Sequence, residues 1–368
     1  MGTKRNSWIL ALILLLTLAL AACQPQGETG EEAEAEDTDA ASTAAETEEA
    51  DHPLAGKKVA LIMQINLGTF SAQYIAGVEE QVEKFGGQTQ VFTSDGDLAK
   101  MASNIDAAIN QQFDAILIDH GTKEALQDGV NRAVEAGIAV VAFDADLEGI
   151  TVLEQGDQDM ANMTLGRLAE DFDGEANIVK IWVAGFAPME RRQIAYQQFL
   201  QDNPGINEVA AFGAATQNTA LDTQAQVEAV LKQYPNEGDI DAIWASWDEF
   251  AKGAVRALEQ AGRTDIKVYG IDMSDEDLQM MQQENSPWVA SAAVDPTDIG
   301  RIQVRYAYQQ LNEEGSVERV LLEPVFVEKE ALPDEQITTE QLSEYVDGWG
   351  ASDQGYTEAL QELEAAFN

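Results

Sequence analysis

Short apolar runs alternate along this chain with segments in which apolar positions recur every three or four residues. The runs, such as 57–63 and 138–143, are typical of strands buried on both faces of a sheet. The segments between them, such as 71–85, are typical of amphipathic helices. Together they predict an α/β fold with a parallel sheet covered by helices on both faces. In this first unit the predicted strands are 57–63, 88–93, 113–118 and 138–143, and the predicted helices are 71–85, 97–112 and 123–136.

The alternation restarts at residue 176 in a second unit of similar size. Its predicted strands are 176–183, 208–212, 241–245, 267–271 and 288–294, and its predicted helices are 189–201, 222–233, 249–260, 275–283 and 298–312. A last predicted strand covers 320–327, and a helical pattern within 345–368 is expected to lie on the surface. Two successive α/β units predict two lobes with a cleft between them.

The chain opens with the features of a secretory signal peptide. Two basic residues precede an apolar run of 14 residues, 9–22, which is shorter than the roughly 20 residues of a membrane-spanning helix. The motif Leu20-Ala21-Ala22-Cys23 resembles the lipobox of bacterial lipoproteins, in which the cysteine at the new amino terminus carries lipid. The resemblance implies that 1–23 is a lipoprotein signal peptide and that acylated Cys23 is anchored in a lipid bilayer. An ordinary signal peptide followed by a coincidental cysteine is the alternative, but Cys23 is the only cysteine of the chain.

Acidic residues dominate the composition, with 66 Asp and Glu against 21 Lys and Arg and a formal net charge of −45. Residues 24–54 predict a disordered acidic tether, because a segment rich in Glu, Ala, Thr and Asp cannot bury enough apolar surface to fold. The rest of the chain is acidic as well, and salt adaptation and a need for solubility are the competing explanations. Such a charge repels phosphate backbones, so we expect no nucleic acid partner.

Polar and aromatic side chains follow the predicted strands at the points where these end. Because ligands of open parallel sheets bind beyond the carboxyl ends of the strands, we expect a binding site there. Carboxylates and amides accept hydroxyl protons, an arginine donates, and rings cover apolar faces, which suits a neutral polyhydroxylated ligand. The residues concerned are Gln64, Asn66, Phe70, Asp119, His120, Asp144, Asp146, Arg192, Trp247, Asp248 and Asp272. The structural alternatives are helix capping for Asp144, Asp248 and Asp272, core packing for Phe70 and Trp247, a surface ion pair for Arg192 and no role for His120.

Motifs of hydrolytic, phosphate-binding and metal-dependent enzymes are absent from the sequence. It contains no G-x-S-x-G elbow, no phosphate loop and no H-E-x-x-H. Its two histidines, His52 and His120, fall in the tether and in the folded region, so they predict no shared metal site. Asp144 and Asp146 could serve glycoside hydrolysis, but alternate residues after a strand point in opposite directions. We expect no cofactor and no enzymatic activity, and a secreted sugar-processing hydrolase is the alternative from another class.

Several stretches of the two α/β units follow one another in a distinctive order. They are Lys58 to Gly77, the run 138–144, Glu190-Arg191-Arg192 with Tyr196-Gln197-Gln198, Asp241 to Glu249 with 253–258, and Val268-Tyr269-Gly270-Ile271-Asp272. Over roughly residues 57–328 the chain resembles the ribose-type periplasmic binding proteins, the sugar-capturing components of bacterial ABC importers. The resemblance implies the type I periplasmic binding fold, with two Rossmann-like lobes joined by three hinge strands and closing over one sugar. The implied units are an amino-terminal lobe of 55–157 and 296–322, a carboxyl-terminal lobe of 158–295 and 323–344, and a tail helix in 345–368.

The resemblance also assigns ligand contacts to individual residues. The aromatic residue after the first strand falls on Phe70, the aspartate of the fourth strand end on Asp144, the sugar-binding arginine on Arg192 and the last aspartate on Asp272. Departures from the ribose pattern are Gly68-Thr69-Phe70-Ser71 for Asn-Pro-Phe-Phe, Asp144-Ala145 for Asp-Arg, Trp247-Asp248 for Asn-Asp and Asn218 for an aromatic residue. We therefore expect another pentose, a hexose, a deoxysugar or a cyclic polyol rather than ribose. In the predicted site Trp247 stacks on this ligand, Gln64, Asn66 or Asn218 supplies hydrogen bonds, and Asp146 is included.

These features predict a lipid-anchored, extracytoplasmic solute-binding protein that captures a sugar or polyol as a monomer and delivers it to an ABC permease. Related sugar-responsive repressors share the two-lobe fold but carry an amino-terminal DNA-binding unit, in whose place a signal peptide and a tether are expected here. A binding protein for a signalling molecule that reports to a receptor is the alternative within the same class.

Overall fold

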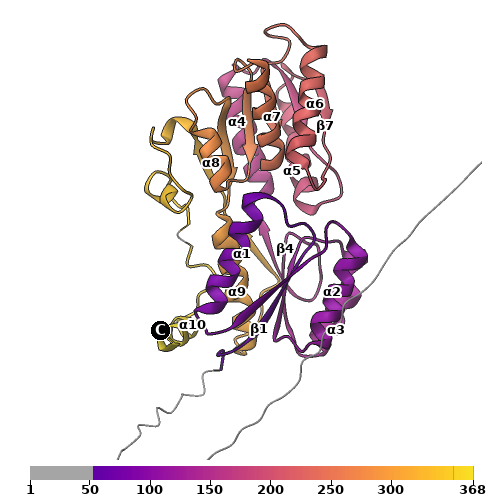
Figure 1. Ribbon diagram of the computed structural model, residues 1–368, viewed down its shortest axis with the longest axis vertical. Coiled ribbons are helices and arrows are strands. Elements are labelled where there is room, and N and C mark those ends of the chain that lie inside the picture. Colours follow the sequence, from indigo (N-terminus) through magenta and orange to yellow (C-terminus); the bar gives the residue numbers. More distant parts are fainter. Residues whose placement is uncertain (1–52, 351, 368) are drawn as a thin grey trace, which may run out of the picture. The chain divides into compact units, whose positions relative to one another are not determined.

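Two six-stranded sheets form the framework of residues 53–350 and 352–367, which the computed structural model describes (Figure 1). All of these residues belong to one unit that spans Glu49 to Asn368. The predicted signal peptide, Cys23 and nearly all of the predicted tether lie outside the described residues. None of the helices in the described part is both long and apolar enough to cross a membrane.

The first sheet, with the helices that cover it, is called the amino-terminal lobe. Its strands follow the order β11-β5-β4-β3-β1-β2, and every neighbouring pair is parallel. Along β1, Val59 and Leu61 pack on the side of α1 and α9, and Ala60 and Ile62 pack on the side of α2 and α3. The elements are β1 (Lys58–Met63), α1 (Gly68–Glu83), β2 (Gln88–Thr93), α2 (Leu98–Asn110), β3 (Ala115–Asp119), α3 (Lys123–Glu135), β4 (Ala139–Phe143), β5 (Thr151–Gln155), α9 (Pro296–Leu311), β11 (Arg319–Leu322) and α10 (Glu358–Phe367).

The second sheet and its helices are called the carboxyl-terminal lobe. The strand order is β12-β10-β9-β8-β6-β7, and only β12 runs antiparallel to its neighbour among these described pairs. One face packs against α4 and α5, and the other packs against α6, α7 and α8. The elements are α4 (Asp157–Asp171), β6 (Ala176–Ile181), α5 (Ala187–Asp202), β7 (Ile206–Phe212), α6 (Thr219–Gln233), β8 (Ala242–Ala245), α7 (Asp248–Ala261), β9 (Lys267–Ile271), α8 (Asp275–Met281), β10 (Trp288–Ala293) and β12 (Val325–Glu328), followed by the short 3₁₀ turns η1 (Lys329–Ala331) and η2 (Gln341–Glu344).

The chain passes between the two sheets after β5, after β10 and after β11. The prediction of a single strand over 320–327 was wrong, because β11 and β12 belong to different sheets. Pro324 lies between them, and a proline has no N–H with which to continue the ladder of hydrogen bonds. The break therefore lets the chain leave one sheet and enter the other.

The carboxyl-terminal segment makes one more passage. Trp349 is almost fully buried in the carboxyl-terminal lobe, where its Nε1 donates to the carbonyl oxygen of Thr339 at 2.7 Å. Farther along, Arg305 of α9 donates to the carbonyl oxygen of Ser352 at 2.8 Å, and Leu360 of α10 is fully buried in the amino-terminal lobe. The predicted tail helix thus buries Leu360 in the core and packs the partly buried Leu363 against it.

Leu360→Ala is expected to lower the free energy of unfolding by about 2–5 kcal/mol, because it leaves a cavity in the core of the amino-terminal lobe. Denaturant titration of the full chain measures this loss. The control is Leu321→Ala. Leu321 is 54% exposed, so this substitution should change the free energy of unfolding by less than about 0.5 kcal/mol. If Leu360→Ala lowered the free energy of unfolding as little as Leu321→Ala, the burial of Leu360 would not stabilise the fold.

Helices α1 and α9 lie side by side and position the first part of the predicted ligand site (Figure 1). Their backbones approach closely at Gly300, where a Cβ would lie 2.4 Å from the carbonyl oxygen of Tyr74. The fully buried Gln303 donates to the carbonyl oxygens of Ile118 at 3.1 Å and Val141 at 2.9 Å, and accepts from the hydroxyl of Tyr74. Gln303 of α9 therefore links α1 to β3 and β4.

Candidate ligand-binding site

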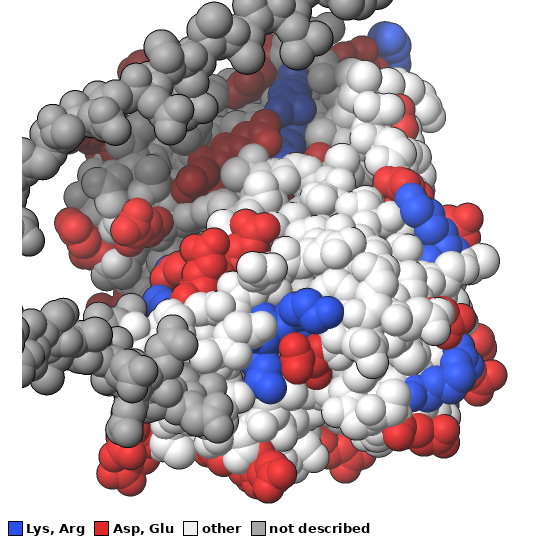
Figure 2. Space-filling view, turned by 60° about the horizontal axis from the view of Figure 1, so that its bottom comes forward, with Lys and Arg blue, Asp and Glu red and all other residues white. Residues whose placement is uncertain are grey.

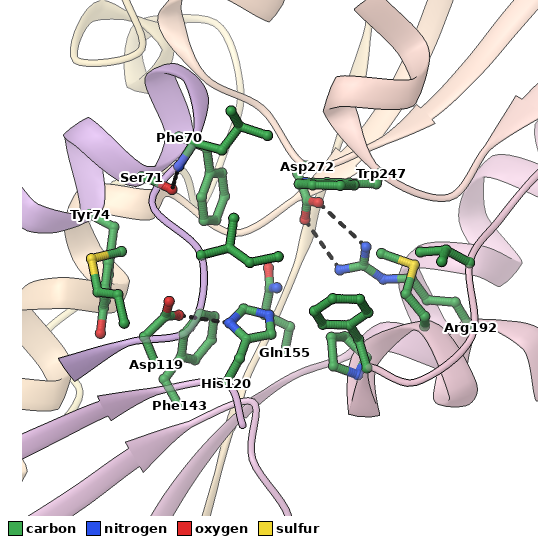
Figure 3. A pocket seen from close by; sticks show the side chains of 17 residues that line it. Phe70, Ser71, Tyr74, Asp119, His120, Phe143, Gln155, Arg192, Trp247 and Asp272 are labelled. Atoms are coloured by element: carbon green, nitrogen blue, oxygen red, sulfur yellow. Dashed lines mark hydrogen bonds and ion pairs between the residues drawn. The ribbon is translucent and has the colours of Figure 1, made fainter. Parts of the chain in front are cut away.

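A cavity lies where the strand ends of both sheets face each other (Figure 3). This is the place at which open parallel sheets bind their ligands. From the amino-terminal lobe it is lined by Met63, Ile65, Leu67, Phe70, Ser71, Tyr74, Asp119, His120, Phe143 and Gln155, and from the carboxyl-terminal lobe by Val183, Phe186, Pro188, Met189, Arg192, Trp247 and Asp272.

Six of the residues singled out from the sequence line this cavity together: Phe70, Asp119, His120, Arg192, Trp247 and Asp272. They come from elements far apart in the sequence: α1, the end of β3, α5, the amino-terminal end of α7 and the loop after β9. Trp247 packs edge-on against Phe250 at 5.4 Å between ring centroids, so one side of the indole belongs to the core and the other faces the cavity. Their role in binding remains a prediction.

Asp248, which is buried, does not line the cavity, and neither do five residues of the predicted site. Gln64 is buried, and its Oε1 accepts from the backbone N–H of Gly121 at 2.8 Å. Asn66 and Asn218 are exposed. The side chain of Asp146 is 63% exposed and lies beside Arg319 on the surface. The fifth, Asp144, is buried behind the cavity wall.

Arg192 is the best-anchored charged group of the cavity. It is 1% exposed, and its Nε donates to Asp157 Oδ1 at 2.7 Å. Its Nη1 donates to the carbonyl oxygen of Ser246 at 2.7 Å, and Nη1 and Nη2 reach the two oxygens of Asp272 at 3.3 and 3.2 Å. Burial raises the pKa of Asp272, and the charge of Arg192 offsets part of that rise. These bonds use four of the five guanidinium protons, which leaves one Nη2–H for a ligand.

His120 adds a second cation, which the sequence interpretation treated as incidental. Its Nδ1 lies 2.7 Å from Asp119 Oδ1, and its ring stands edge-on to Phe143 and to Phe186 of the opposite lobe. Burial lowers the pKa of His120, but the charge and the hydrogen bond of Asp119 more than reverse this, so that its pKa is about 9. Because Nδ1 is occupied and Nε2 has no hydrogen-bond partner among the described residues, Nε2 can donate to a ligand.

The pKa of His120 predicts that the chain loses stability at alkaline pH. A folded-state pKa of about 9, above the ordinary 6.5, gives a stabilisation that is complete below pH 6.5 and is lost as the pH rises through about 9. We expect the free energy of unfolding to fall by roughly 1–3 kcal/mol over this interval. Denaturant titrations at several pH values measure it, and His120→Gln should remove this part of the pH dependence. An unchanged profile in that variant would place the titrating group elsewhere.

Asp144 and Gln155 form a hydrogen-bonded pair beside the cavity. The side chain of Asp144 is fully buried and makes an ion pair with Arg191, which comes from α5 of the opposite lobe and also donates to Asp157 Oδ2 at 2.7 Å. Asp144 Oδ2 accepts from Gln155 Nε2 at 3.2 Å. Gln155 lines the cavity at the end of β5 and is 5% exposed, and its Oε1 has no partner among the described residues. The sequence interpretation missed Gln155 because it did not recognise β5.

The rest of the lining is mostly apolar and includes five aromatic residues. Phe70, Tyr74 and Phe143 stand on one side and Phe186 and Trp247 on the other. A few convergent polar groups in an apolar cavity suit a small hydroxylated molecule that also has an apolar part. Among the described residues no group of three or more His, Cys, Asp or Glu side chains is arranged to hold a metal ion.

The charge on the protein surface is consistent with a neutral ligand rather than a polyanion. On the face drawn in Figure 2, Asp and Glu side chains are spread widely, and Lys and Arg occur in small groups among them. This face offers no continuous basic patch of the kind that a nucleic acid backbone requires.

Comparison with known proteins agrees with this geometry. The family described as "Periplasmic binding protein domain" matches residues 59–315. The ribose import binding protein RbsB of Escherichia coli is 25% identical over 225 residues, which cover 60% of this chain and 73% of that protein. A sugar ABC transporter structure from Yersinia enterocolitica is 38% identical with a TM-score of 0.82, over 85% of this chain and 96% of that one. The 5-methylthioribose transporter solute-binding protein of Thermotoga lettingae, in complex with 5-methylthioribose, is 38% identical with a TM-score of 0.80, over 84% and 98%.

Proposed function

This chain belongs to the periplasmic binding protein family, and from that premise we propose how it serves sugar import. It is the extracytoplasmic, sugar- or polyol-binding component of an ABC transporter and not an enzyme. The observation that supports capture by closure is the cavity itself, to which both lobes contribute polar groups: Asp119, His120 and Gln155 from one, Arg192 and Asp272 from the other. In our proposal the lobes close around the ligand and the chain then hands it to a membrane permease.

The proposed ligand is a pentose-like sugar that carries an apolar substituent. The polar groups can bind hydroxyls, but Met63, Ile65, Leu67 and Phe70 offer an apolar surface that plain ribose would leave unfilled. The protein of Thermotoga lettingae, of comparable size and 38% identical, holds 5-methylthioribose, a pentose with such a substituent. We therefore propose 5-methylthioribose or a closely similar molecule for this chain.

Thermal unfolding of the full-length chain with a panel of sugars tests this proposal. A ligand at 100 times its dissociation constant stabilises the folded state by about 2.7 kcal/mol, which is visible as a rise in melting temperature. We expect 5-methylthioribose to raise the melting temperature more than ribose, xylitol or allitol does at equal concentration. A larger rise with ribose would refute the apolar substituent, and no rise with any sugar or polyol would refute the proposed ligand class.

Lipid anchoring through Cys23 is a further part of the proposal. Its support is the sequence alone: the apolar run 9–22 and the single cysteine that follows it. Expression in a bacterium with labelled palmitate should label the wild-type chain and leave it in the membrane fraction. Cys23→Ala should abolish labelling. An unlabelled wild-type chain would favour an ordinary signal peptide.

A further inference from the structure

Among the described residues that line the cavity, Gln155 alone has a fully buried side-chain polar atom without a hydrogen-bond partner. It faces the cavity, and one of its buried polar atoms, Oε1, has no hydrogen-bond partner among the described residues. The residue is 5% exposed, so bulk water does not reach this oxygen freely. A buried carbonyl oxygen without a partner is unfavourable, and a hydroxyl of a bound sugar would satisfy it.

The orientation of this amide follows from its neighbour. Asp144 Oδ2, a carboxylate oxygen, lies 3.2 Å from Gln155 Nε2 and can only accept. The amide therefore has to present Nε2 to Asp144 and Oε1 to the cavity, because the flipped amide would place two acceptors against each other. Figure 3 shows Gln155 close to His120, between Phe143 and the Arg192–Asp272 pair.

Asp144 does not line the cavity, and both of its carboxylate oxygens already accept hydrogen bonds from the protein. Oδ2 accepts from Gln155, and Oδ1 is held by Arg191. Arg191 belongs to the carboxyl-terminal lobe, whereas Asp144 and Gln155 belong to the amino-terminal lobe. The contact that fixes Asp144 therefore exists only when the two lobes are together.

Resting on the proposed function, we propose that Gln155 is a specificity-determining residue whose Oε1 accepts a hydrogen bond from one hydroxyl of the bound sugar. Asp144 is a positioning residue that fixes the amide without touching the ligand. Arg191 completes this arrangement on lobe closure, so that the hydroxyl acceptor is fully oriented in the closed state. The protein should therefore prefer sugars that carry a free hydroxyl within hydrogen-bonding distance of Gln155 Oε1.

Calorimetric titration with hydroxyl-deleted sugars tests the role of Gln155. The probes are 5-methylthioribose and its 2-deoxy and 3-deoxy analogues, titrated into the purified full-length chain. The wild-type chain should bind one deoxy analogue about 10–100 times more weakly than the parent. Gln155→Met should bind the parent about 10–100 times more weakly and should no longer distinguish it from that analogue. The matched control is Gln310→Met, since Gln310 bonds to Val140 and Thr151 outside the cavity, and it should keep the wild-type discrimination.

The hydroxyl discrimination ratio also separates the two roles, because loss of stability alone does not move it. Asp144→Asn should reduce this ratio in the wild-type background and should leave the affinity ratio between the parent and the other deoxy analogue unchanged. A change in that second ratio would show that Asp144 touches the ligand and would overturn the positioning role. Binding by the wild-type chain with discrimination retained in Gln155→Met, or with no discrimination at all, would overturn the role of Gln155. If the wild-type chain bound no sugar, the proposed function itself would fail, and this inference with it.

Discussion

Arg192→Met is expected to weaken sugar binding by more than about 100-fold and to destabilise the free protein as well. The substitution removes a charged donor from the cavity, leaves Asp272 buried without its cation and leaves Asp157 with Arg191 alone. Breaking such a buried pair costs about 3–5 kcal/mol of unfolding free energy. Calorimetric titration with 5-methylthioribose measures the first effect, and denaturant titration measures the second.

Two further variants are compared with Arg192→Met: one separates charge from shape at the same position, and the other is a surface control. Arg192→Lys keeps the charge but lacks the planar fork that reaches both oxygens of Asp272, so its affinity should fall between the wild type and Arg192→Met. Arg132→Met removes an exposed ion pair with Asp106 and should leave both stability and affinity close to those of the wild type. Wild-type affinity in a folded Arg192→Met variant would reduce Arg192 to a structural residue.

Most of the strands and helices could be placed along the chain from the sequence, because buried strands and amphipathic helices have different periods. The predicted strands at 88–93 and 267–271 coincide with β2 and β9. The rule that ligands bind beyond strand ends then led to Phe70, Trp247 and Asp272, because the carboxyl ends of parallel strands share one edge of a sheet. This part of the site depends on topology alone.

The sequence pattern did not predict β5 and α4, and without β5 it could not identify Gln155 as a site residue. The sequence of β5 is only five residues long and mixes Thr151, Glu154 and Gln155 with two apolar residues, so it shows no apolar run. Its burial comes from pairing with β4 and with β11, a strand some 160 residues farther along the chain. No local pattern contains that information. Gln155 could therefore be identified only once the pairing of β5 with β4 and β11 was known.

Side-chain direction in the loops could not be predicted either. Asp144 has a positive φ of 50°, which turns its side chain into the protein toward Arg191. Asp146, two residues later, lies on the surface. His120 also has a positive φ, 61°, and its aspartate neighbour in the sequence was the available sign of a charged imidazole. Such directions depend on tertiary partners, which composition and periodicity do not reveal.

Gly300→Ala is expected to destabilise the amino-terminal lobe by about 3 kcal/mol and to weaken sugar binding at least several-fold. The added Cβ would lie 2.4 Å from the carbonyl oxygen of Tyr74 and 2.7 Å from the backbone nitrogen of Val78, so α1 has to move away from α9. Because α1 carries Phe70 and Tyr74 into the cavity, its displacement shifts the apolar wall of the ligand site. Denaturant and calorimetric titrations of the same preparation measure both effects.

Gly166→Ala in α4 is the matched control for this prediction. A Cβ there meets no atom within 4 Å, so alanine should stabilise its helix by roughly 0.5–1 kcal/mol through the lower entropy of the unfolded chain and leave affinity unchanged. If Gly300→Ala destabilises the protein and Gly166→Ala stabilises it, the loss at Gly300 comes from the close contact between α9 and α1 and not from replacing a glycine as such. If Gly300→Ala bound sugar like the wild type despite its lost stability, the wall formed by Phe70 and Tyr74 would not depend on the seating of α1 against α9.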